Sequence, residues 1–328
     1  MKLEPNLWFD EVVKTYHLIS PHIHHTQLVT CPNLNEELDG RFLFKPESLQ
    51  ITGSFKVRGA LSAISRLSKD ELKRGVIAYS SGNHAQGVAH AAKVFNTPAT
   101  VVMPTDAPER KIANAKALGA KVIHYDRRTE SREEMSREIA KEKNLVIINP
   151  YDALETIYGQ GTAAYEVIND AKNPKLDNAI ICAGGGGLTA GSCISIKHIN
   201  PECNVFTAEP EEWNDHQLSF EKNERVEMDI NRGGLCDGLL TPTPGAIPFA
   251  INTHFGVKGL SASDQAVCDA MRFAFNRLNL KLEPSGAVAL ACLLENKEKF
   301  RGSRTLVMLS GGNVDQQTFA ECLAKASQ

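Results

Sequence analysis

The sequence predicts an α/β fold built on a doubly wound, mainly parallel sheet. The first observation behind this prediction is that short apolar runs alternate with amphipathic segments of helical length along most of the chain. Such an alternation is typical of strands joined by helices that cover both faces of a sheet. The second observation is that polar or glycine-rich loops follow three of the apolar runs. The chain of 328 residues is long enough for two domains with separate cores.

The strands and helices are expected to follow one another along the chain. The predicted strands are the apolar runs 76–79, 99–103, 121–125, 145–148, 178–182, 204–208 and 305–309. The predicted helices are the amphipathic segments 84–95, 109–118, 131–142 and 153–171, and a segment that begins at Leu188. No sequence repeat, low-complexity segment or proline-rich linker interrupts this order, so composition alone marks no domain boundary.

The composition is that of an ordinary soluble enzyme. Hydrophobic residues make up 42% of the chain and charged residues 23%. The net charge of -3 gives no basis for binding nucleic acid, and no run of about 18 apolar residues predicts a membrane span. The N-terminus lacks the apolar segment of a signal peptide, and the eight cysteines form no C-x-x-C pair. Reduced, buried thiols and a cytoplasmic location are therefore expected.

Four segments have the composition of loops that bind a polar ligand. Lys56 stands in a turn rich in serine and glycine at the start of a predicted helix. Three polar loops follow predicted strands: residues 80–84 (Ser-Ser-Gly-Asn-His), residues 184–187 (four glycines) and residues 310–313 (Ser-Gly-Gly-Asn). An isolated lysine of this kind is usually an exposed surface charge. The three loops make a shared ligand site the better interpretation.

Together the four segments resemble the tryptophan-synthase-like (fold type II) enzymes, which use pyridoxal 5'-phosphate (PLP). More narrowly, they resemble the serine and threonine dehydratases, serine racemases and 3-hydroxyaspartate dehydratases. The resemblance extends from about Phe42 to Asp315, with all four motifs in order. It implies two doubly wound, mainly parallel domains with PLP in the cleft between them. The small domain would be residues 72–149, inserted in a large domain of residues 1–71 and 150–328. The resemblance also implies a homodimer.

The resemblance assigns a cofactor role to each segment. PLP catalysis requires an amine for the aldehyde, an anion site for the phosphate and a partner for the ring nitrogen. Lys56, preceded by Phe55 at the cofactor site, would supply the amine and then act as the base for the α-proton of the substrate. The phosphate would be bound by Gly184, Gly185, Gly186, Gly187 and Leu188. Glycine lets several N–H groups point at one anion at the start of a helix.

Three further residues are expected around the cofactor ring. By resemblance, Asn83 hydrogen-bonds the phenolic oxygen, Ser310 faces the pyridine nitrogen and Glu283 lies near the ring. A hydroxyl partner leaves the pyridine nitrogen largely unprotonated, so the ring is a weaker electron sink and prompt loss of a β-hydroxyl is favoured. Without a ligand, Asn83 would be a helix cap, Glu283 a helix-start acid and Ser310 part of a turn.

The loop of residues 80–84 is expected to bind the α-carboxylate of the substrate through N–H groups and hydroxyls. Its members are Ser80, Ser81, Gly82, Asn83 and His84. By resemblance, the Ser81 hydroxyl lies on the side of the cofactor opposite Lys56, where inversion of the α-carbon needs a second base. Arg132 could contact a second carboxylate, or it could be a solvated helix charge. Gly238 is expected near the substrate.

The tetraglycine also fits a different cofactor. Gly185, Gly187 and Ala190 match the dinucleotide fingerprint G-x-G-x-x-A, and Glu209 ends the next predicted strand, where an acid that binds ribose belongs. On this segment alone, NAD is a fair candidate. PLP is preferred because the fingerprint leaves Lys56, the 80–84 loop and Ser310 without a role.

An acidic cluster follows the predicted strand 204–208. Hard cations such as Mg²⁺ or Ca²⁺ prefer several oxygen ligands, and the resemblance favours a metal held by Glu209, Asp215 and the backbone carbonyl of Trp213. The alternative is a solvated acidic loop. The three histidines at positions 22, 24 and 25 are expected in a surface loop rather than at a zinc site.

These assignments predict a PLP-dependent ammonia-lyase, or dehydratase. It would convert a β-hydroxy amino acid (L-threonine, L-serine or 3-hydroxyaspartate) to a 2-oxo acid and ammonia. A racemase of serine or aspartate with side dehydratase activity is the alternative, because the second serine of the 80–84 loop resembles racemases and 3-hydroxyaspartate dehydratases. Tyr151 is an aromatic residue typical of dehydratases at its position. An NAD-dependent oxidoreductase is a remote alternative. Since the chain stops soon after Ser310, a C-terminal regulatory domain and feedback by isoleucine are not expected.

Overall fold

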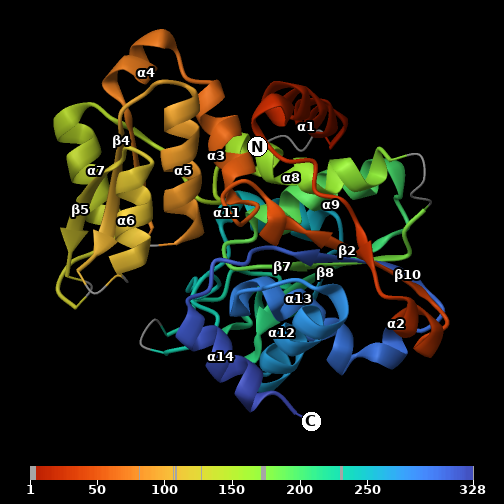
Figure 1. The fold of residues 1–328 in the computed structure, drawn as a ribbon. Coiled ribbons are helices and arrows are strands. Elements are labelled where there is room, and N and C mark those ends of the chain that lie inside the picture. Colours follow the sequence, from red (N-terminus) through yellow and green to blue (C-terminus); the bar gives the residue numbers. More distant parts are fainter. Residues whose placement is uncertain are drawn as a thin grey trace.

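The computed structural model describes residues 5–80, 82–105, 107, 109–126, 128–170, 175–229 and 232–327. Within these residues the chain forms two separate sheets, each covered by helices (Figure 1). No helix in this part of the chain is both long and apolar enough to cross a membrane. All eight cysteines lie within it, and each is buried and free.

The larger sheet combines strands from both ends of the chain. Its order is β1-β2-β10-β7-β8-β9, and all neighbours are parallel except β1 and β2. The strands are β1 (Val29–Thr30), β2 (Arg41–Pro46), β7 (Asn178–Cys182), β8 (Asn204–Pro210), β9 (Lys258–Ala262) and β10 (Arg304–Leu309). The strands β7 and β10 are buried along almost their whole length, as expected for strands that are covered on both faces.

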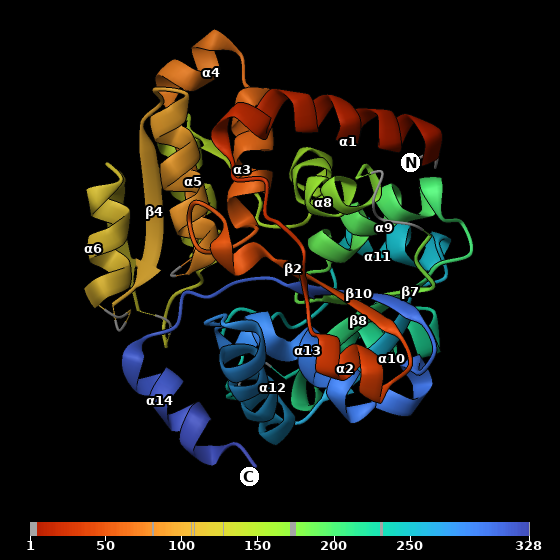
Figure 2. The same ribbon diagram turned by 45° about the vertical axis from the view of Figure 1, so that its right-hand side comes forward.

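Helices cover both faces of this sheet, as Figure 2 shows. On one face lie α1 (Pro5–Ile19), α3 (Lys56–Ser65), α8 (Leu154–Ile168), α9 (Gly187–Ile199) and α11 (Ala246–His254). On the other face lie α2 (Pro32–Glu37), α12 (Asp264–Leu278), α13 (Pro284–Glu295) and α14 (Gln316–Lys325). The short helix α10 (Asp215–Lys222) packs beside β8 and β9.

The smaller sheet has the order β5-β4-β3-β6, and all its neighbours are parallel. Its strands are β3 (Val76–Tyr79), β4 (Ala99–Pro104), β5 (Lys121–Tyr125) and β6 (Val146–Ile147). The associated helices are α4 (Lys69–Arg74), α5 (Asn83–Val94), α6 (Glu109–Ala117) and α7 (Arg132–Lys143). The α/β fold with mainly parallel sheets is thus confirmed. The domain boundaries at residues 72 and 149 stay a prediction, although all four strands fall between them.

The predicted loops leave the carboxyl ends of parallel strands. Ser80 follows β3, the four glycines follow β7, and Ser310 follows β10. Because β7 and β10 are parallel neighbours, with Ile180 paired to Val307, their loops emerge at the same edge of the larger sheet. In an open parallel sheet this edge is where ligands bind.

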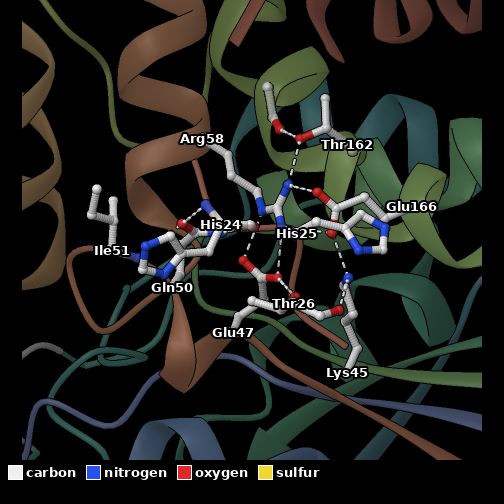
Figure 3. A network of polar contacts seen from close by, with 12 residues as sticks. His24, His25, Thr26, Lys45, Glu47, Gln50, Ile51, Arg58, Thr162 and Glu166 are labelled. Carbon is white, nitrogen blue, oxygen red and sulfur yellow. Dashed lines mark hydrogen bonds and ion pairs between the residues drawn. The ribbon is translucent and has the colours of Figure 1, made fainter. Parts of the chain in front are cut away.

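A buried cluster of four charged side chains joins β2, α3 and α8 (Figure 3). Arg58 on α3 donates to Glu47 through Nε at 2.7 Å and to Glu166 through Nη1 at 2.8 Å. Lys45, near the end of β2, also donates to Glu166. Thr26 completes the cluster, since its hydroxyl donates to Glu47 and its carbonyl accepts from Lys45, both at 2.7 Å. The two positive and two negative charges therefore compensate each other in the protein interior.

The charges of the cluster depend on one another. Burial alone would lower the pKa of Arg58, but the carboxylates of Glu47 and Glu166 raise it above its ordinary value. Burial would raise the pKa of Glu47, and Arg58 brings it below its ordinary value instead. Loss of one partner from such a cluster leaves an uncompensated buried charge. The cluster thus holds α3, whose first residue is Lys56, against α8 and the end of β2.

Replacement of Arg58 by methionine is expected to lower the free energy of unfolding by about 3–5 kcal/mol, because Glu47 and Glu166 are left unpaired inside the protein. Urea unfolding followed by circular dichroism measures the change. The matched control is Arg301→Met, which removes an exposed ion pair with Glu298 and should leave the unfolding free energy almost unchanged. Equal losses in the two variants would contradict a special role of the buried cluster.

Candidate active site

A cavity of about 160 Å³ is lined by residues that follow strands of both sheets. It brings together almost all of the residues predicted to bind the cofactor and the substrate. These are Phe55, Lys56, Ser80, Gly82, Asn83, His84, Arg132, Gly184, Gly185, Gly186, Gly187, Leu188, Gly238, Glu283 and Ser310. Ser81 lies outside the residues that the structure describes. Segments from distant parts of the sequence thus surround one space.

Lys56 is the first residue of α3 and extends its amine into the cavity. Before it, the N–H of Phe55 donates to the carbonyl of Ser310 at 3.1 Å, which ties the start of α3 to the end of β10. The Lys56 amine donates to the carbonyl of Pro150 at 2.9 Å. Burial lowers the pKa of this amine from 10.5 to about 8. A substantial fraction of the amine is therefore neutral, and nucleophilic, near neutral pH.

The glycine loop requires the absence of side chains. Gly186 has a φ of +87°, a conformation that residues with a side chain rarely adopt. A Cβ atom at Gly185 would lie 2.2 Å from ring carbons of Tyr151, and one at Gly187 would lie 2.6 Å from Oε1 of Gln160. The helix α9 begins at Gly187 without a capping side chain. Its first N–H groups are therefore available to an anion in the cavity.

The polar residues expected around a cofactor ring contact one another. Asn83 at the start of α5 donates to Oε1 of Glu283 at 2.6 Å. Asn313 donates to Oδ1 of Asn83 at 2.7 Å and to the carbonyl of Thr52 at 2.8 Å. Because Asn83 follows the smaller sheet while Glu283 and Asn313 belong to elements of the larger one, these bonds cross between the two sheets.

Ser310 and Cys182 lie at the ends of neighbouring strands and both line the cavity. Burial raises the pKa of the Cys182 thiol to about 11, against the opposing effect of a hydrogen bond with Ser310. The thiol is therefore neutral at pH 7 and acts as a small polar neighbour of Ser310 and Lys56. No sequence signal indicated Cys182, because its preceding residues form an ordinary apolar strand.

Some hydrogen-bonding groups of the 80–84 loop are already paired within the protein. The N–H of Gly82 donates to the hydroxyl of Ser80 at 3.1 Å. The ring of His84 is buried and its Nε2 bonds the carbonyl of Ile148 at 2.8 Å. Burial lowers the pKa of His84 to about 3, so the ring is neutral. Nε2 of the imidazole therefore has a structural partner, whereas Nδ1 is buried and has no hydrogen-bond partner among the described residues.

Arg132 lies at a corner of the cavity beside two tyrosines. It begins α7, donates to Glu133 at 2.8 Å, and has its guanidinium 6.0 Å from the ring centre of Tyr79. Burial raises the pKa of Tyr151 to about 12, so its phenol is neutral. The Arg132 side chain lines the cavity and is 43% exposed. The two tyrosines, Pro150 and Gln160 are lining residues that sequence reasoning did not assign to the site.

Gly238, expected near the substrate, lines the cavity. Its N–H donates to the hydroxyl of Ser285 at 2.9 Å, and a Cβ atom at this position would lie 3.0 Å from that hydroxyl. The backbone of residue 238 thus packs directly on the first turn of α13. A larger residue would push the loop into the cavity.

The acidic cluster is a buried pair of carboxylates beside exposed ones. Glu209 at β8 and Asp215 at the start of α10 are both 0% exposed, whereas Glu211 and Glu212 are exposed. The interpretation as a solvated loop is therefore wrong for Glu209 and Asp215. Burial raises the pKa of Asp215 to about 8. Burial and the neighbouring Asp215 raise the pKa of Glu209 well above its ordinary value.

The two buried carboxylates differ in their partners. Glu209 accepts the N–H groups of His216 at 2.7 Å and Gln217 at 2.9 Å, whereas no other described residue donates to the Asp215 oxygens, which interact with the Glu209 carboxyl itself. Trp213, which lies between them in the sequence, is also buried, and its indole N–H donates to the carbonyl of Gly233. A buried carboxylate without a donor from another residue is costly, and a cation at this place would remove the cost.

The dinucleotide alternative loses support, and the histidine cluster is placed. Glu209 does not line the cavity, because main-chain N–H groups of α10 bind its carboxylate. The acid that the dinucleotide alternative assigned to a ribose is therefore not at the cavity. His22 lies beside Phe95, while His24 contacts the carbonyl of Leu49. Within the described residues, no group of three or more histidine, cysteine, aspartate or glutamate side chains could hold a metal ion.

Comparisons with known proteins agree with this geometry. A family model described as "Pyridoxal-phosphate dependent enzyme" matches residues 19–311. The chain is 38% identical to a serine racemase of Schizosaccharomyces pombe over 97% of both chains. It is also 38% identical to an L-threo-3-hydroxyaspartate ammonia-lyase of Saccharomyces cerevisiae over 96% of both chains.

Solved structures show the same similarity. The structure of maize serine racemase has a TM-score of 0.90 and 32% identity, and the match covers 97% of each chain. The processed form of threonine deaminase isoform 2 from Solanum lycopersicum has a TM-score of 0.93 and 29% identity, covering 99% of this chain and 95% of that one. With Lys56, the glycine loop and Ser310 around one cavity, the chain belongs to the family of pyridoxal-phosphate dependent enzymes of fold type II.

Proposed function

We propose that this protein is an ammonia-lyase that dehydrates a β-hydroxy amino acid. The observation that carries the proposal is the position of the Lys56 amine in the same cavity as the glycine loop and Ser310. Relatives named L-threo-3-hydroxyaspartate ammonia-lyase and L-threonine ammonia-lyase, at 38% and 36% identity, support it. The cofactor is PLP, and the finer assignments of residues are part of the proposal.

The cavity residues fit PLP by their chemistry. Lys56 would hold the aldehyde, and the glycine loop with the N-terminus of α9 would bind the phosphate. Asn83 would face the phenolic oxygen and Ser310 the pyridine nitrogen, with Glu283 beside the ring. When bound, PLP supplies an electron sink for the electron pair that is left on the α-carbon of an amino acid.

The protein residues would then perform two tasks. The first task is to bind the α-carboxylate of the substrate through the N–H groups of the 80–84 loop. The second is proton transfer: Lys56 would take the α-proton and pass it to the β-hydroxyl, so that the bond between the β-carbon and its oxygen breaks and the hydroxyl leaves as water. The enamine that is released exchanges its nitrogen for the oxygen of a water molecule outside the protein. The products are a 2-oxo acid and ammonia.

Arg132 supports a substrate that carries a second carboxylate, such as 3-hydroxyaspartate. Its guanidinium is the positive group at the corner formed with Tyr79 and Tyr151. The tyrosine hydroxyls are neutral and can donate hydrogen bonds to the same oxygen atoms. L-Serine and L-threonine offer no second carboxylate and would leave Arg132 with its bond to Glu133.

Racemisation is the second candidate function, because a relative at 38% identity is named serine racemase. Lys56 can reach the α-carbon from one face, so inversion requires a group on the other face. We assign that role to Ser81 by the family resemblance alone. A preference for racemisation would then depend on how its hydroxyl is activated.

A divalent cation, Mg²⁺ or Ca²⁺, is proposed at Glu209 and Asp215, with the carbonyl of Trp213 as a third oxygen ligand. The buried Asp215 oxygens, to which no other residue in the described ranges donates, support this assignment, because hard cations prefer carboxylate and carbonyl oxygen. A cation that binds only the folded protein stabilises it. A chelator that changes neither the melting temperature nor turnover would contradict the assignment.

Further proposals concern the assembly, the location and the domains of the protein. The family resemblance supports a homodimer, which light scattering of the purified protein would test.

The free cysteines are compatible with a reducing compartment, so we propose a cytoplasmic location, which fractionation of cells would test. The division into domains at residues 72 and 149 is also proposed, and limited proteolysis near these positions would examine it.

The purified protein is expected to absorb visible light, and borohydride should attach the cofactor permanently to Lys56. A panel of L-serine, D-serine, L-threonine and 3-hydroxyaspartate, assayed for oxo acid and for inverted amino acid, then tests the reaction. Oxo acid should exceed inverted product for at least one L-substrate. Labelling of another lysine, or bound NAD, would overturn the cofactor assignment, whereas dominant inversion would favour the racemase.

Replacement of Arg132 by alanine should lower kcat/KM for 3-hydroxyaspartate by about tenfold more than for L-serine, since a charged hydrogen bond is lost only with the diacid. Because Arg132 is partly exposed, the expected loss in kcat/KM is at the lower end of the range for charged hydrogen bonds. Arg137→Ala, on the exposed side of the same helix, is the matched control and should affect both substrates alike. Equal losses in Arg132→Ala would remove this residue from substrate selection.

The capture of PLP by cofactor-free protein should accelerate as the pH rises through about 8 and then level off. The pKa of Lys56 is lowered to about 8, so its neutral, nucleophilic form accumulates over this range. Stopped-flow absorbance between pH 6.5 and 9.5 measures the rate, and N-acetyl-lysine in solution is the control, since its rate should rise to about pH 10. Parallel profiles would show that burial does not change the reactivity of Lys56.

A further inference from the structure

His216 connects the two buried sites. Its Nε2 atom lies 2.8 Å from the carbonyl oxygen of Gly184, the first residue of the glycine loop. A Cβ atom at Gly186 would lie 2.4 Å from Cε1 of the same ring. The imidazole therefore fills the space behind the loop and donates a hydrogen bond to its first carbonyl. The next carbonyl, of Gly185, is held by the N–H of Gly245 at 3.0 Å.

The main-chain N–H of His216 binds one of the two buried carboxylates. Its N–H donates to Oε1 of Glu209 at 2.7 Å, and the following N–H, of Gln217, donates to Oε2 at 2.9 Å. Asp215, the residue before it, is fully buried, and within the described part of the chain no other residue donates a hydrogen bond to its side-chain oxygens. The first turn of α10 thus sets the position of the His216 ring. The carboxylates of Glu209 and Asp215 lie at this turn.

We propose that His216 is a positioning residue that couples cation binding at Glu209 and Asp215 to PLP binding at the glycine loop. The inference rests on the proposed function, which places PLP and the cation at these two sites. A bound cation neutralises the two carboxylates and fixes the first turn of α10. The imidazole is then held in place, and with it the carbonyl of Gly184.

The coupling acts through the orientation of peptide groups. If the Gly184 carbonyl is fixed on the side of His216, the N–H groups of the following glycines keep their direction toward the cavity. Glycine has the largest freedom of rotation in the unliganded state, so restraint of this loop lowers the entropy that PLP binding must remove. By thermodynamic reciprocity, PLP raises the affinity for the cation by the same factor as the cation raises the affinity for PLP.

The test compares PLP retention by the full-length holoenzyme in Mg²⁺ and in a chelator. Samples are dialysed at fixed concentrations of free PLP, and bound PLP is read from visible absorbance. Binding of Mg²⁺ is measured separately, from the melting temperature as a function of Mg²⁺ concentration. In the wild type, Mg²⁺ should lower the dissociation constant of PLP by about fivefold or more, the usual range for coupled sites.

Four variants locate the coupling. His216→Ala should abolish the effect of Mg²⁺ on PLP affinity while Mg²⁺ still binds, and His216→Phe should do the same while the ring still packs against Phe220. His216→Gln should restore part of the effect, because its amide N–H can occupy the place of Nε2. Gln217→Ala is the matched control, since it keeps the main-chain N–H to Glu209 and lies next to His216; it should behave as the wild type.

Each other outcome overturns a different statement. If His216→Ala or His216→Phe retains the wild-type effect of Mg²⁺ on PLP, His216 has no positioning role. If the wild type binds Mg²⁺ without any change in PLP affinity, the two sites are independent, although the cation site stands. If the wild type binds no divalent cation, both the cation site and the coupling fall, while the assignment of PLP to Lys56 is unaffected.

Discussion

Arg58 lies two residues after Lys56 on α3, and its guanidinium is bound by Glu47 and Glu166 in the interior of the protein. These charges cannot separate without the cost of an unpaired buried ion, so they fix α3 against α8 and the end of β2. The geometry of the cavity depends on this restraint. Lys56 begins α3, and the same α8 supplies Gln160, which shares the Pro150 carbonyl with the Lys56 amine.

The cavity is assembled from the ends of strands in two sheets. Parallel strands place their carboxyl ends at one edge, which explains why loops from distant parts of the sequence meet. Bonds between Asn83, Glu283 and Asn313 then join the loop that follows the smaller sheet to elements of the larger one. A residue such as Asn83 therefore serves two purposes, since it would face a ligand and it also ties two halves of the molecule together.

Periodicity predicted three strands with the bounds that they have in the structure, 76–79, 121–125 and 178–182. It missed β2 because Lys45 carries a charge in a buried strand, and that charge is compensated by Glu166, which is 121 residues away. The motifs indicated the loops of the site. They could not indicate Gln160 or His216, whose side chains bond the main-chain carbonyls of Pro150 and Gly184. Tyr151 was expected only as an aromatic residue typical of dehydratases, and the structure adds that it lines the cavity. Nor could they show that Glu209 and Asp215 are buried while neighbouring acids are not.

The carbonyl of Pro150 gives the Lys56 amine a hydrogen-bond partner inside the protein. It accepts from Lys56 at 2.9 Å and from Gln160 at 3.0 Å, so a lysine that is displaced by substrate has a defined partner inside the protein and need not be solvated. Pro150 lies on the segment that returns from β6 to α8. If the smaller sheet rotated toward the larger, this partner would shift, and the pKa of the lysine amine would change with it.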